Sequence, residues 1–330
     1  MRRVLSLVLI VFLFVLLLVA CTPAPYSAVL CGKMNTDVLI TLYSNGADKS
    51  ADELIAACED LLDEAEQALS RTDAAAELAR VNANMETTVT LSDTLADMLR
   101  LSLSLSRETS GAFDPTAGAL SVLYDITGDT HLPPDPDALA AAKATVDYTA
   151  LALEGNTLSR PVGTVLDFGA IAKGHLAAVL VDYLLAEGVS GGVLSLGGNV
   201  AVFGEKPNGK PFRVAVRAPE GGYLGELALS GNTYVSTSGA YERFRVGTDG
   251  VTYHHIFDPA TGKPADSGLA SVTVVSRDGA RADALSTALY VMGYDAAISF
   301  WEKAGRNFDM ILVREDGEVF VTPDLTFEAA

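Results

Sequence analysis

The second half of the chain carries a run of strand-like stretches that helices do not interrupt. Short apolar or alternating stretches, the pattern of β-strands, occur at residues 212–217, 234–238, 253–257 and 269–276. Two helical stretches follow only afterwards, at residues 280–292 and 295–304. Strict alternation of strands and helices is the pattern of a doubly wound parallel sheet, whereas runs of each indicate an α+β fold. We therefore expect a single α+β domain with mixed or antiparallel sheets and packed helices.

The other periodic stretches predict the elements around this β-rich region. Apolar residues at helical spacing predict an amphipathic helix at residues 51–70, and Ser92 is a candidate N-cap for a second helix that stops at Gly111. The remaining expected elements are strands at 34–43 and 164–168, a helix at 171–187, a strand entering Gly197, a closing hairpin at 310–321, and a proline-rich loop at 129–136.

The N-terminus has the pattern of a bacterial lipoprotein signal. Residues 4–20 are apolar except for Ser6, follow two arginines and run directly into Cys21. A plain membrane anchor is the alternative, but the apolar stretch is short for a membrane span. We expect cleavage after residue 20 and acylation of Cys21, palmitate included. The expected organisation is a signal at 1–20, a tether at 21–33, the folded domain at 34–322 and a tail at 323–330. The chain is then an extracytoplasmic lipoprotein anchored in a bacterial cell membrane.

Two further cysteines, Cys31 and Cys58, are either a disulfide pair or two unpaired thiols. An exported protein can form disulfides, but a domain of this size does not need one, and Cys58 falls on the apolar face of the predicted helix. We favour two unpaired thiols.

The charge of the chain limits its partners. The sequence contains 42 Asp and Glu residues against 23 Lys and Arg residues, for a net charge of -19. Binding to nucleic acid depends on contacts between Lys or Arg and phosphate, so a nucleic-acid partner is not expected. Because 49% of the residues are apolar, the chain has ample material for a folded core.

Clusters of small and polar residues interrupt the periodic pattern and are the candidate functional segments. They lie at residues 111–115, 167–174, 236–239, 255–262 and 282–288. The second cluster places Lys173 where a strand is expected to enter a helix, a position at which free backbone N–H groups favour an anion. Its spacing fits neither of the common nucleotide-binding glycine motifs, so an ordinary glycine turn is an equal alternative.

Asp283 and Thr287 lie four residues apart and share one face of an otherwise apolar helix. A carboxylate in such a place is costly unless it is paired or bound to a metal. Oxygen ligands of this kind suit Mg²⁺. The alternative is an aspartate stabilised by the positive end of the helix, with the threonine merely packing.

His255 is one of only 4 histidines, and it precedes a turn of sequence Asp-Pro-Ala-Thr-Gly. A histidine in this position is a candidate general base near neutral pH. The alternative is a histidine with a purely structural role.

Taken together and in this order, the clusters resemble the ApbE family, the FAD:protein FMN transferases. The resemblance extends from about Met34 to Val321, and its most specific segments are DFGAIAKG, VSTSGAYERF, HHIFDPATGKP and ADALSTAL. It implies a T-fold-like α+β domain and a Mg²⁺-dependent enzyme. Such an enzyme transfers the FMN part of FAD to a Thr or Ser hydroxyl of a target protein and releases AMP. The expected targets are flavoprotein subunits of membrane redox complexes or extracytoplasmic electron-transfer proteins.

The resemblance also implies roles for individual residues. Asp283, Thr287 and the main-chain oxygen of Ala170 match the family's metal ligands, and His255 and Asp283 match its catalytic positions. The positions implied to contact FAD are Met34, Thr72, Ala112, Phe113, Asp114, Asp167, Lys173, Ile256 and Ser286.

Two positions depart from the family pattern. Asn35 stands in place of a glycine, and Thr72 stands where a tyrosine commonly packs on the flavin. Two other functions stay open beside the transferase. One is a Mg²⁺-dependent pyrophosphatase that splits FAD into FMN and AMP, and the other is a flavin-binding lipoprotein without catalysis.

Overall fold

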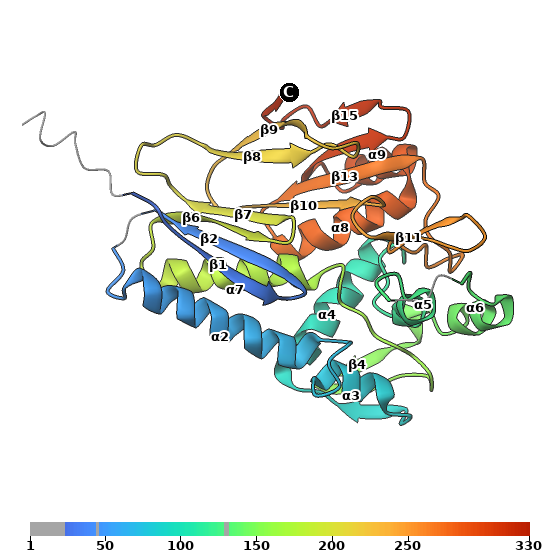
Figure 1. Cartoon of the computed structure of the whole chain (residues 1–330). Helices are drawn as coiled ribbons and strands as arrows, with labels where there is room; N and C mark the ends of the chain where they lie inside the picture. Colours follow the sequence, from blue (N-terminus) through green and yellow to red (C-terminus); the bar gives the residue numbers. More distant parts are fainter. Residues whose placement is uncertain (1–23, 44–45, 129–131) are drawn as a thin grey trace, which may run out of the picture.

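A central antiparallel sheet of eight strands runs through the protein (Figure 1). The computed structural model describes residues 24–43, 46–128 and 132–330. From one edge to the other, the strands are β1 (Tyr26–Lys33), β2 (Thr36–Leu42), β6 (Gly191–Leu196), β7 (Asn199–Gly204), β10 (Thr233–Gly239), β13 (Leu269–Ser276), β14 (Asp309–Arg314) and β15 (Val319–Val321). The α+β fold is confirmed.

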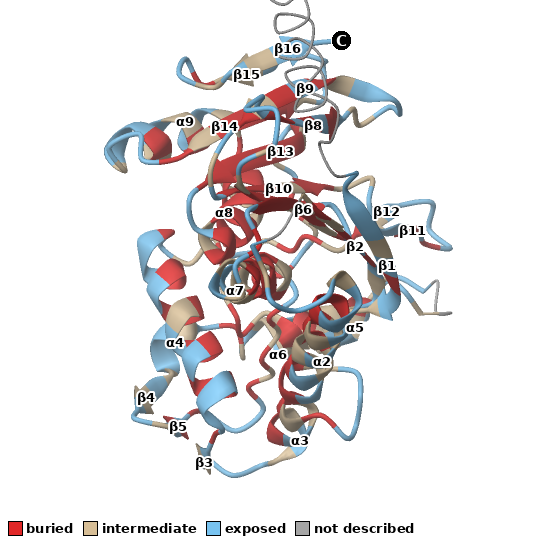
Figure 2. Ribbon diagram, turned by 90° about the vertical axis from the view of Figure 1, so that its left-hand side faces the viewer, coloured by how far each residue is buried: buried red, intermediate tan, exposed pale blue. Residues whose placement is uncertain are grey.

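Helices cover one face of this sheet. Figure 1 shows α7 (Ala172–Ala186) and α8 (Gly279–Met292) beneath the strands, with α2 (Ala51–Leu69) and α4 (Asp93–Glu108) farther out. Both α7 and α8 have buried residues on most of their circumference, as expected for helices enclosed between two layers. By contrast, α2 and α4 are amphipathic and expose one side to solvent (Figure 2).

The opposite face of the sheet packs on a smaller three-stranded sheet. This sheet contains β8 (Phe212–Arg217), β9 (Tyr223–Leu229) and β16 (Phe327–Ala329). Because side chains alternate along a strand, neighbouring residues serve different cores. Val274 belongs to the helix-side core, whereas Val275 belongs to the core between the two sheets.

The shorter elements lie around the large sheet and its helices. They are α3 (Glu77–Ala83), α5 (Gly118–Tyr124), α6 (Pro136–Lys143), the 3₁₀ turn η1 (Tyr148–Ala150), α9 (Tyr294–Lys303), and the strands β3 (Thr88–Thr90), β4 (Ala152–Glu154), β5 (Thr157–Ser159), β11 (Phe244–Val246) and β12 (Thr252–His254).

Local signals in the sequence account for the long helices. Ser50 and Glu53 form a capping box at the start of α2, and the side chain of Ser92 caps α4 as predicted. Cys58 is fully buried on α2, Cys31 is exposed on β1, and both are free thiols. Two unpaired cysteines is therefore the correct interpretation.

The strand predicted at residues 164–168 is wrong. This segment forms only an isolated bridge between Val165 and Ala117. The backbone N–H and carbonyl of Leu166 are instead hydrogen-bonded by the side-chain amide of Asn82, each at 2.8 Å. A side chain thus replaces the neighbouring strand. Likewise, the predicted strand at 253–257 ends earlier, because β12 stops at His254.

Both ends of the domain are longer than predicted. Residues 26–33 of the expected tether form β1, which pairs with β2 from Tyr26 onwards. The expected tail at 323–330 contains β16, which pairs with β9. The strand β1 forms a hairpin with the strand that follows it, whereas β16 pairs with a strand about 100 residues earlier, a partner that the local pattern does not reveal.

The predicted signal at 1–20 and Cys21 lie outside the described residues. Within the part that the structure describes, no helix is both long and apolar enough to cross a bilayer.

Candidate functional site

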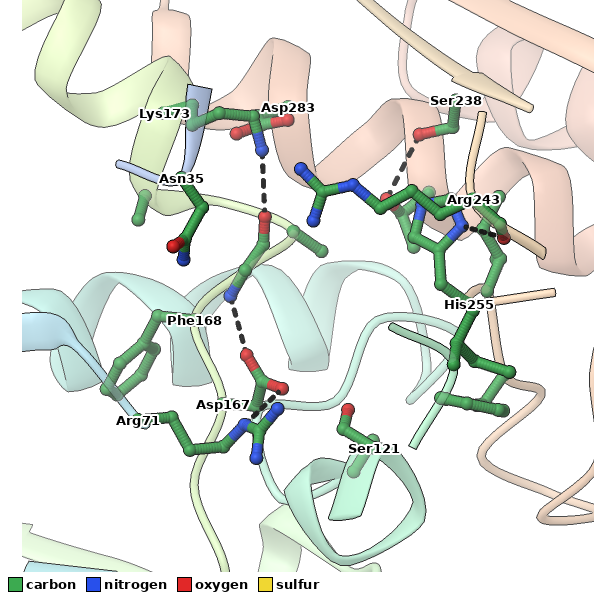
Figure 3. Close-up of a pocket in the computed structure, with 18 of the residues that line it drawn as sticks. Asn35, Arg71, Ser121, Asp167, Phe168, Lys173, Ser238, Arg243, His255 and Asp283 are labelled. Atoms are coloured by element: carbon green, nitrogen blue, oxygen red, sulfur yellow. Dashed lines mark hydrogen bonds and ion pairs between the residues drawn. The ribbon is translucent and has the colours of Figure 1, made fainter. Parts of the chain in front are cut away.

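A cavity of about 650 Å³ opens beside the first turn of α7, a volume typical of small-molecule sites (Figure 3). Residues from all five polar clusters line it. The cavity brings together most of the predicted site residues, namely Met34, Thr72, Ala112, Phe113, Asp114, Asp167, Ala170, Lys173, His255, Ile256, Asp283 and Thr287.

Two glycines allow α7 and α8 to cross closely enough to build one wall. A Cβ added to Gly174 would lie 2.1 Å from the Gly279 carbonyl oxygen, and one added to Gly279 would lie 2.2 Å from the Gly174 oxygen. Neither distance is possible for a real side chain, so these positions require glycine. The close crossing carries Asp283, on α8, to the N-terminal turn of α7.

The carboxylate of Asp283 is buried and held from two sides. It accepts a hydrogen bond from the Gly174 backbone N–H at 2.9 Å and another from the Ser236 hydroxyl at 3.0 Å. None of the ion pairs between described residues includes Asp283. A buried carboxylate without a cationic partner is costly, which is the expected state of a metal ligand that awaits its ion.

The oxygen atoms around Asp283 fit a hard cation. Thr287 lies one turn farther along α8, and its hydroxyl is 3.2 Å from that of Ser238. Because the Gly174 N–H turns to Asp283, it does not bond to the Ala170 carbonyl four residues earlier, and this oxygen accepts no hydrogen bond from the described residues. The described residues contain no group of three His, Cys, Asp or Glu side chains placed for a metal. One carboxylate, a hydroxyl and a carbonyl suit Mg²⁺, which takes few protein ligands.

Asn199 adds an unpaired donor to the same wall. Its side chain is 5% exposed, its Oδ1 lies 2.5 Å from the Ser236 hydroxyl, and it lines the cavity. The amide nitrogen Nδ2 is buried and has no partner among the described residues. Buried donors are nearly always satisfied, so this nitrogen indicates a missing ligand.

Three cationic side chains face the cavity. Lys173 donates a hydrogen bond to the Gly169 carbonyl at 3.2 Å and has no ion pair with any described residue, and Arg243 reaches in between Lys173 and His255 (Figure 3). Arg71 forms an ion pair with Asp167 at 3.1 Å. The lining also includes the carboxylates Glu66, Asp114, Asp125, Asp167, Glu242 and Asp283. Any attraction for an anion is therefore confined to the part of the cavity beside Lys173 and Arg243.

His255 has the geometry of a general base. Its Nδ1 lies 3.1 Å from the Arg243 carbonyl oxygen, which can only accept, so Nδ1 carries the proton and Nε2 keeps a free lone pair. Burial in the cavity wall lowers the pKa of His255 to about 4, with further lowering by the nearby cations Arg243 and Lys173. The imidazole is therefore neutral at physiological pH.

The adjacent His254 shows the structural alternative. Its Nε2 lies 3.1 Å from the Ala265 carbonyl, and its Nδ1 accepts from the Ile256 N–H at 3.3 Å. Both ring nitrogens are satisfied and the side chain is buried, so His254 has no nitrogen left for chemistry.

The far end of the cavity is built from two tight turns. Met34 and Asn35 have φ of 53° and 56°, so Asn35 takes the left-handed conformation that a glycine would take, a conformation that asparagine tolerates. Asp114 accepts hydrogen bonds from Thr116 and Tyr148 that hold the second turn, and burial raises its pKa. Thr72 is exposed at the rim and offers no aromatic ring.

Ser286 is the exception among the predicted site residues. It does not line the cavity. Its hydroxyl is fully buried and bonds to the Ser238 hydroxyl and the Asp283 carbonyl, both at 2.8 Å. Ser286 thus supports the wall from behind.

The prediction missed Arg71, Asn199 and Arg243. Arg243 lies inside the segment VSTSGAYERF, Arg71 is the neighbour of Thr72, and Asn199 follows a glycine pair at a strand end. Each residue lies in or next to a segment that the sequence singles out, but only the folded structure brings these side chains to one cavity.

Comparison with known proteins identifies the family. Residues 34–312 match the model of the ApbE family, and the chain belongs to this family. The FAD:protein FMN transferase of Treponema pallidum is 36% identical over 278 residues, which cover 78% of this chain and 76% of the relative. The family expected from the sequence motifs is confirmed.

Solved structures agree. The fold is similar to the flavin transferase ApbE from Vibrio cholerae, with a TM-score of 0.81, 27% identity, and coverage of 91% of this chain and 98% of that chain. It is also similar to the ApbE protein from Thermotoga maritima, with a TM-score of 0.83, 28% identity, and coverage of 91% and 97%.

Proposed function

We propose that this protein is an FAD:protein FMN transferase that requires Mg²⁺. In this reaction FMN passes from FAD to a Ser or Thr hydroxyl of a target protein, and AMP is released. The observation that carries the proposal is a single cavity that combines an oxygen-ligand set, free cations and a neutral histidine base. The relatives named as FAD:protein FMN transferases support the same activity.

The reaction balances as a phosphoryl-group transfer. A bond forms between the acceptor oxygen and the phosphorus of the FMN half of FAD. The bond from that phosphorus to the bridging oxygen of the pyrophosphate breaks, and AMP leaves with its electrons. The acceptor hydroxyl proton passes to Nε2 of His255, whose lone pair is free because Nδ1 is tied to the Arg243 carbonyl. The products are a phosphodiester on the target, AMP and one proton.

The cations of the site bind and orient the diphosphate. Lys173 and Arg243 face the cavity without an ion-pair partner among the described residues, and both can neutralise phosphate oxygens. The Asn199 amide supplies a further neutral donor. Positioning and charge neutralisation are the main requirements of this type of transfer.

Asp283, Thr287 and the Ala170 carbonyl are the proposed Mg²⁺ ligands. When bound, the ion would neutralise charge on the diphosphate and stabilise the leaving phosphate. The unpaired carboxylate of Asp283 and the unbonded carbonyl of Ala170 support this assignment.

The remaining wall is the proposed flavin and nucleoside site. Met34, Thr72, Ile256 and the turn at residues 112–114 would contact FAD, and the ion pair of Arg71 with Asp167 fixes the rim between them. The exposed Thr72 makes a weaker platform than an aromatic ring, so a modest affinity for FAD is expected.

The lipoprotein-like pattern of residues 1–21 supports a location outside the cytoplasm for the proposed activity. A lipid anchor at Cys21 would hold the enzyme at the membrane surface, where subunits of membrane redox complexes and extracytoplasmic electron-transfer proteins are accessible targets. Export of a tagged full-length chain and mass analysis of its N-terminus test this assignment.

The experiment for the proposed function uses the chain from residue 24 onwards, FAD, Mg²⁺ and a target protein with a flavinylation motif. Covalent FMN on the target, detected by mass spectrometry, is the expected result. Free FMN and AMP formed at the same rate without a target would instead indicate the pyrophosphatase. FAD binding with no turnover, equal in the parent and in Asp283→Ala, would indicate a flavin-binding lipoprotein.

A further inference from the structure

The hairpin of β11 and β12 projects from the body of the protein (Figures 1 and 2). Arg243, which lines the cavity, immediately precedes β11, and His255 immediately follows β12. The two residues are hydrogen-bonded to each other across the base of the hairpin. The position of the hairpin is therefore tied to the proposed general base.

One face of the hairpin is anchored. Arg245 is buried and donates to the Tyr124 carbonyl at 3.1 Å and to the Leu132 carbonyl at 2.8 Å. Its guanidinium also lies over the ring of Tyr253, its partner on β12. These contacts make the hairpin a fixed platform rather than a loose loop.

The other face carries unpartnered apolar side chains. Phe244 and Val246 lie two residues apart, so their side chains point to the same face. Phe244 is 53% exposed and Val246 is 52% exposed. They give the strand next to the general base an apolar surface that no described element covers.

The outer edge of β11 is also free. The Arg243 carbonyl and the Gly247 N–H bond to His255 and Val251, so residues 243, 245 and 247 direct their backbone groups towards β12. Because these groups alternate along a strand, those of Phe244 and Val246 point away. The sheet of β11 and β12 has two strands among the described residues, and none of them pairs with this edge.

We propose that the outer edge of β11 binds the acceptor segment of the target protein as an added β-strand. The inference rests on the proposed function. An extended polypeptide satisfies the free backbone groups, and its alternate side chains pack on Phe244 and Val246. A strand bound here runs along β11 towards Arg243, so the segment that continues past Arg243 can bring its Ser or Thr hydroxyl to the part of the cavity that Arg243 lines. The acceptor segment is therefore extended, with apolar residues at the positions that face Phe244 and Val246.

A polypeptide fits this surface better than the other possible occupants. The cavity must receive a hydroxyl from the target while FAD is bound, and an extended segment reaches it without unfolding either protein. A second copy of this chain and a lipid surface would use the apolar pair but have no need of the position beside His255. Both are outcomes that the test separates.

The test uses Val246→Pro and the double variant Phe244→Ala/Val246→Ala in the otherwise unchanged protein. Proline removes the outward N–H of residue 246, which the hairpin itself does not use. The KM for the target protein is expected to rise about 10-fold or more in each variant, as for truncated interface anchors. FAD affinity and the kcat at saturating target stay within about twofold. Tyr223→Ala is the matched control, because Tyr223 is 67% exposed on β9 and does not line the cavity.

An unchanged KM in both variants would overturn the proposal. With KM unchanged, a difference in sedimentation between the variants and the parent would indicate instead that the hairpin is an interface between two copies of this chain. With KM unchanged, a loss of binding to phospholipid vesicles in the variants would indicate a membrane contact. If the parent transfers no FMN to any target, the proposed function itself fails, and that result is distinct from transfer that is insensitive to the hairpin.

Discussion

The backbone N–H of Gly174 donates a hydrogen bond of 2.9 Å to the carboxylate of Asp283. This bond joins the first turn of α7 to the second turn of α8. It places a buried acidic group at the positive end of a helix, beside Lys173 and the free carbonyl of Ala170. The bond exists because Gly174 and Gly279 let the two helices cross at backbone contact.

Gly174→Ala is predicted to separate the two helices. The added Cβ meets the Gly279 oxygen at 2.1 Å and the Asp283 Cβ at 2.6 Å, so the free energy of unfolding falls by about 2–3 kcal/mol. Chemical denaturation measures this loss. Gly46→Ala is the control, since its nearest new contact is at 3.5 Å and the change stays within about 0.5 kcal/mol. Equal stabilities of the two variants would contradict the close crossing.

Asp283→Asn is predicted to abolish Mg²⁺ binding without unfolding the protein. For the parent, Mg²⁺ at 10 or more times its dissociation constant adds about 1–3 kcal/mol to the free energy of unfolding. The Asp283→Asn variant shows no such gain. Thermal unfolding with and without Mg²⁺, in the absence of FAD, measures the difference. Asp60→Asn, a change at an exposed position of α2, retains the parent's response. A full Mg²⁺ response in Asp283→Asn would refute the ligand assignment.

His255→Gln is predicted to lower kcat by about 10²–10⁴-fold, as expected for loss of a general base, while FAD affinity changes little. Because the pKa of His255 is lowered to about 4, the parent's rate stays level from pH 7.5 to about pH 5 and declines below it. A decline centred near pH 6.5 instead would show that His255 is not the titrating base.

The lowered pKa of His255 also makes the free energy of unfolding depend on pH. The unfolded chain binds the His255 proton with the ordinary pKa of 6.5, whereas the folded protein binds it only near 4. The folded protein therefore loses stability as the pH falls from about 6.5 towards 4, and His255→Gln makes this loss smaller. Unfolding temperatures across this pH range compare the two proteins.

Thr72→Tyr is predicted to tighten FAD binding about 3- to 10-fold, because a ring at the rim can stack on the flavin. Quenching of flavin fluorescence measures the dissociation constant. Thr72→Ser keeps the polarity without the ring and binds like the parent. If Thr72→Tyr binds FAD no better than Thr72→Ser, the flavin does not lie over this part of the rim.

The sequence predicts those parts of the fold that are set by local pattern. Helical periodicity and a serine cap locate α4, and alternation locates β8 and β13 at their observed bounds. The segment at 164–168 misleads, because the Asn82 amide satisfies Leu166 where a strand would have done so. The strand β16 also escapes prediction, because its partner β9 lies about 100 residues earlier, and β1 falls in the segment expected to be a tether although it forms a hairpin with β2.

The residues of the site also divide into those that the sequence reveals and those that only the folded structure reveals. Asp283, Lys173 and His255 stand out because they interrupt apolar or glycine-rich segments. Arg243 does not stand out, because a surface arginine and a cavity arginine look alike until the chain folds. The unpaired amide of Asn199 is likewise a property of its surroundings in the folded protein.

The most direct test of the account is the intact mass of a target protein after incubation with this enzyme, FAD and Mg²⁺. The account predicts that the target gains FMN on a Ser or Thr, with AMP formed in equal amount. It predicts no gain with Asp283→Asn or without Mg²⁺. FAD bound in the presence of Mg²⁺ with no covalent FMN on any target, or equal transfer by Asp283→Asn, would contradict it.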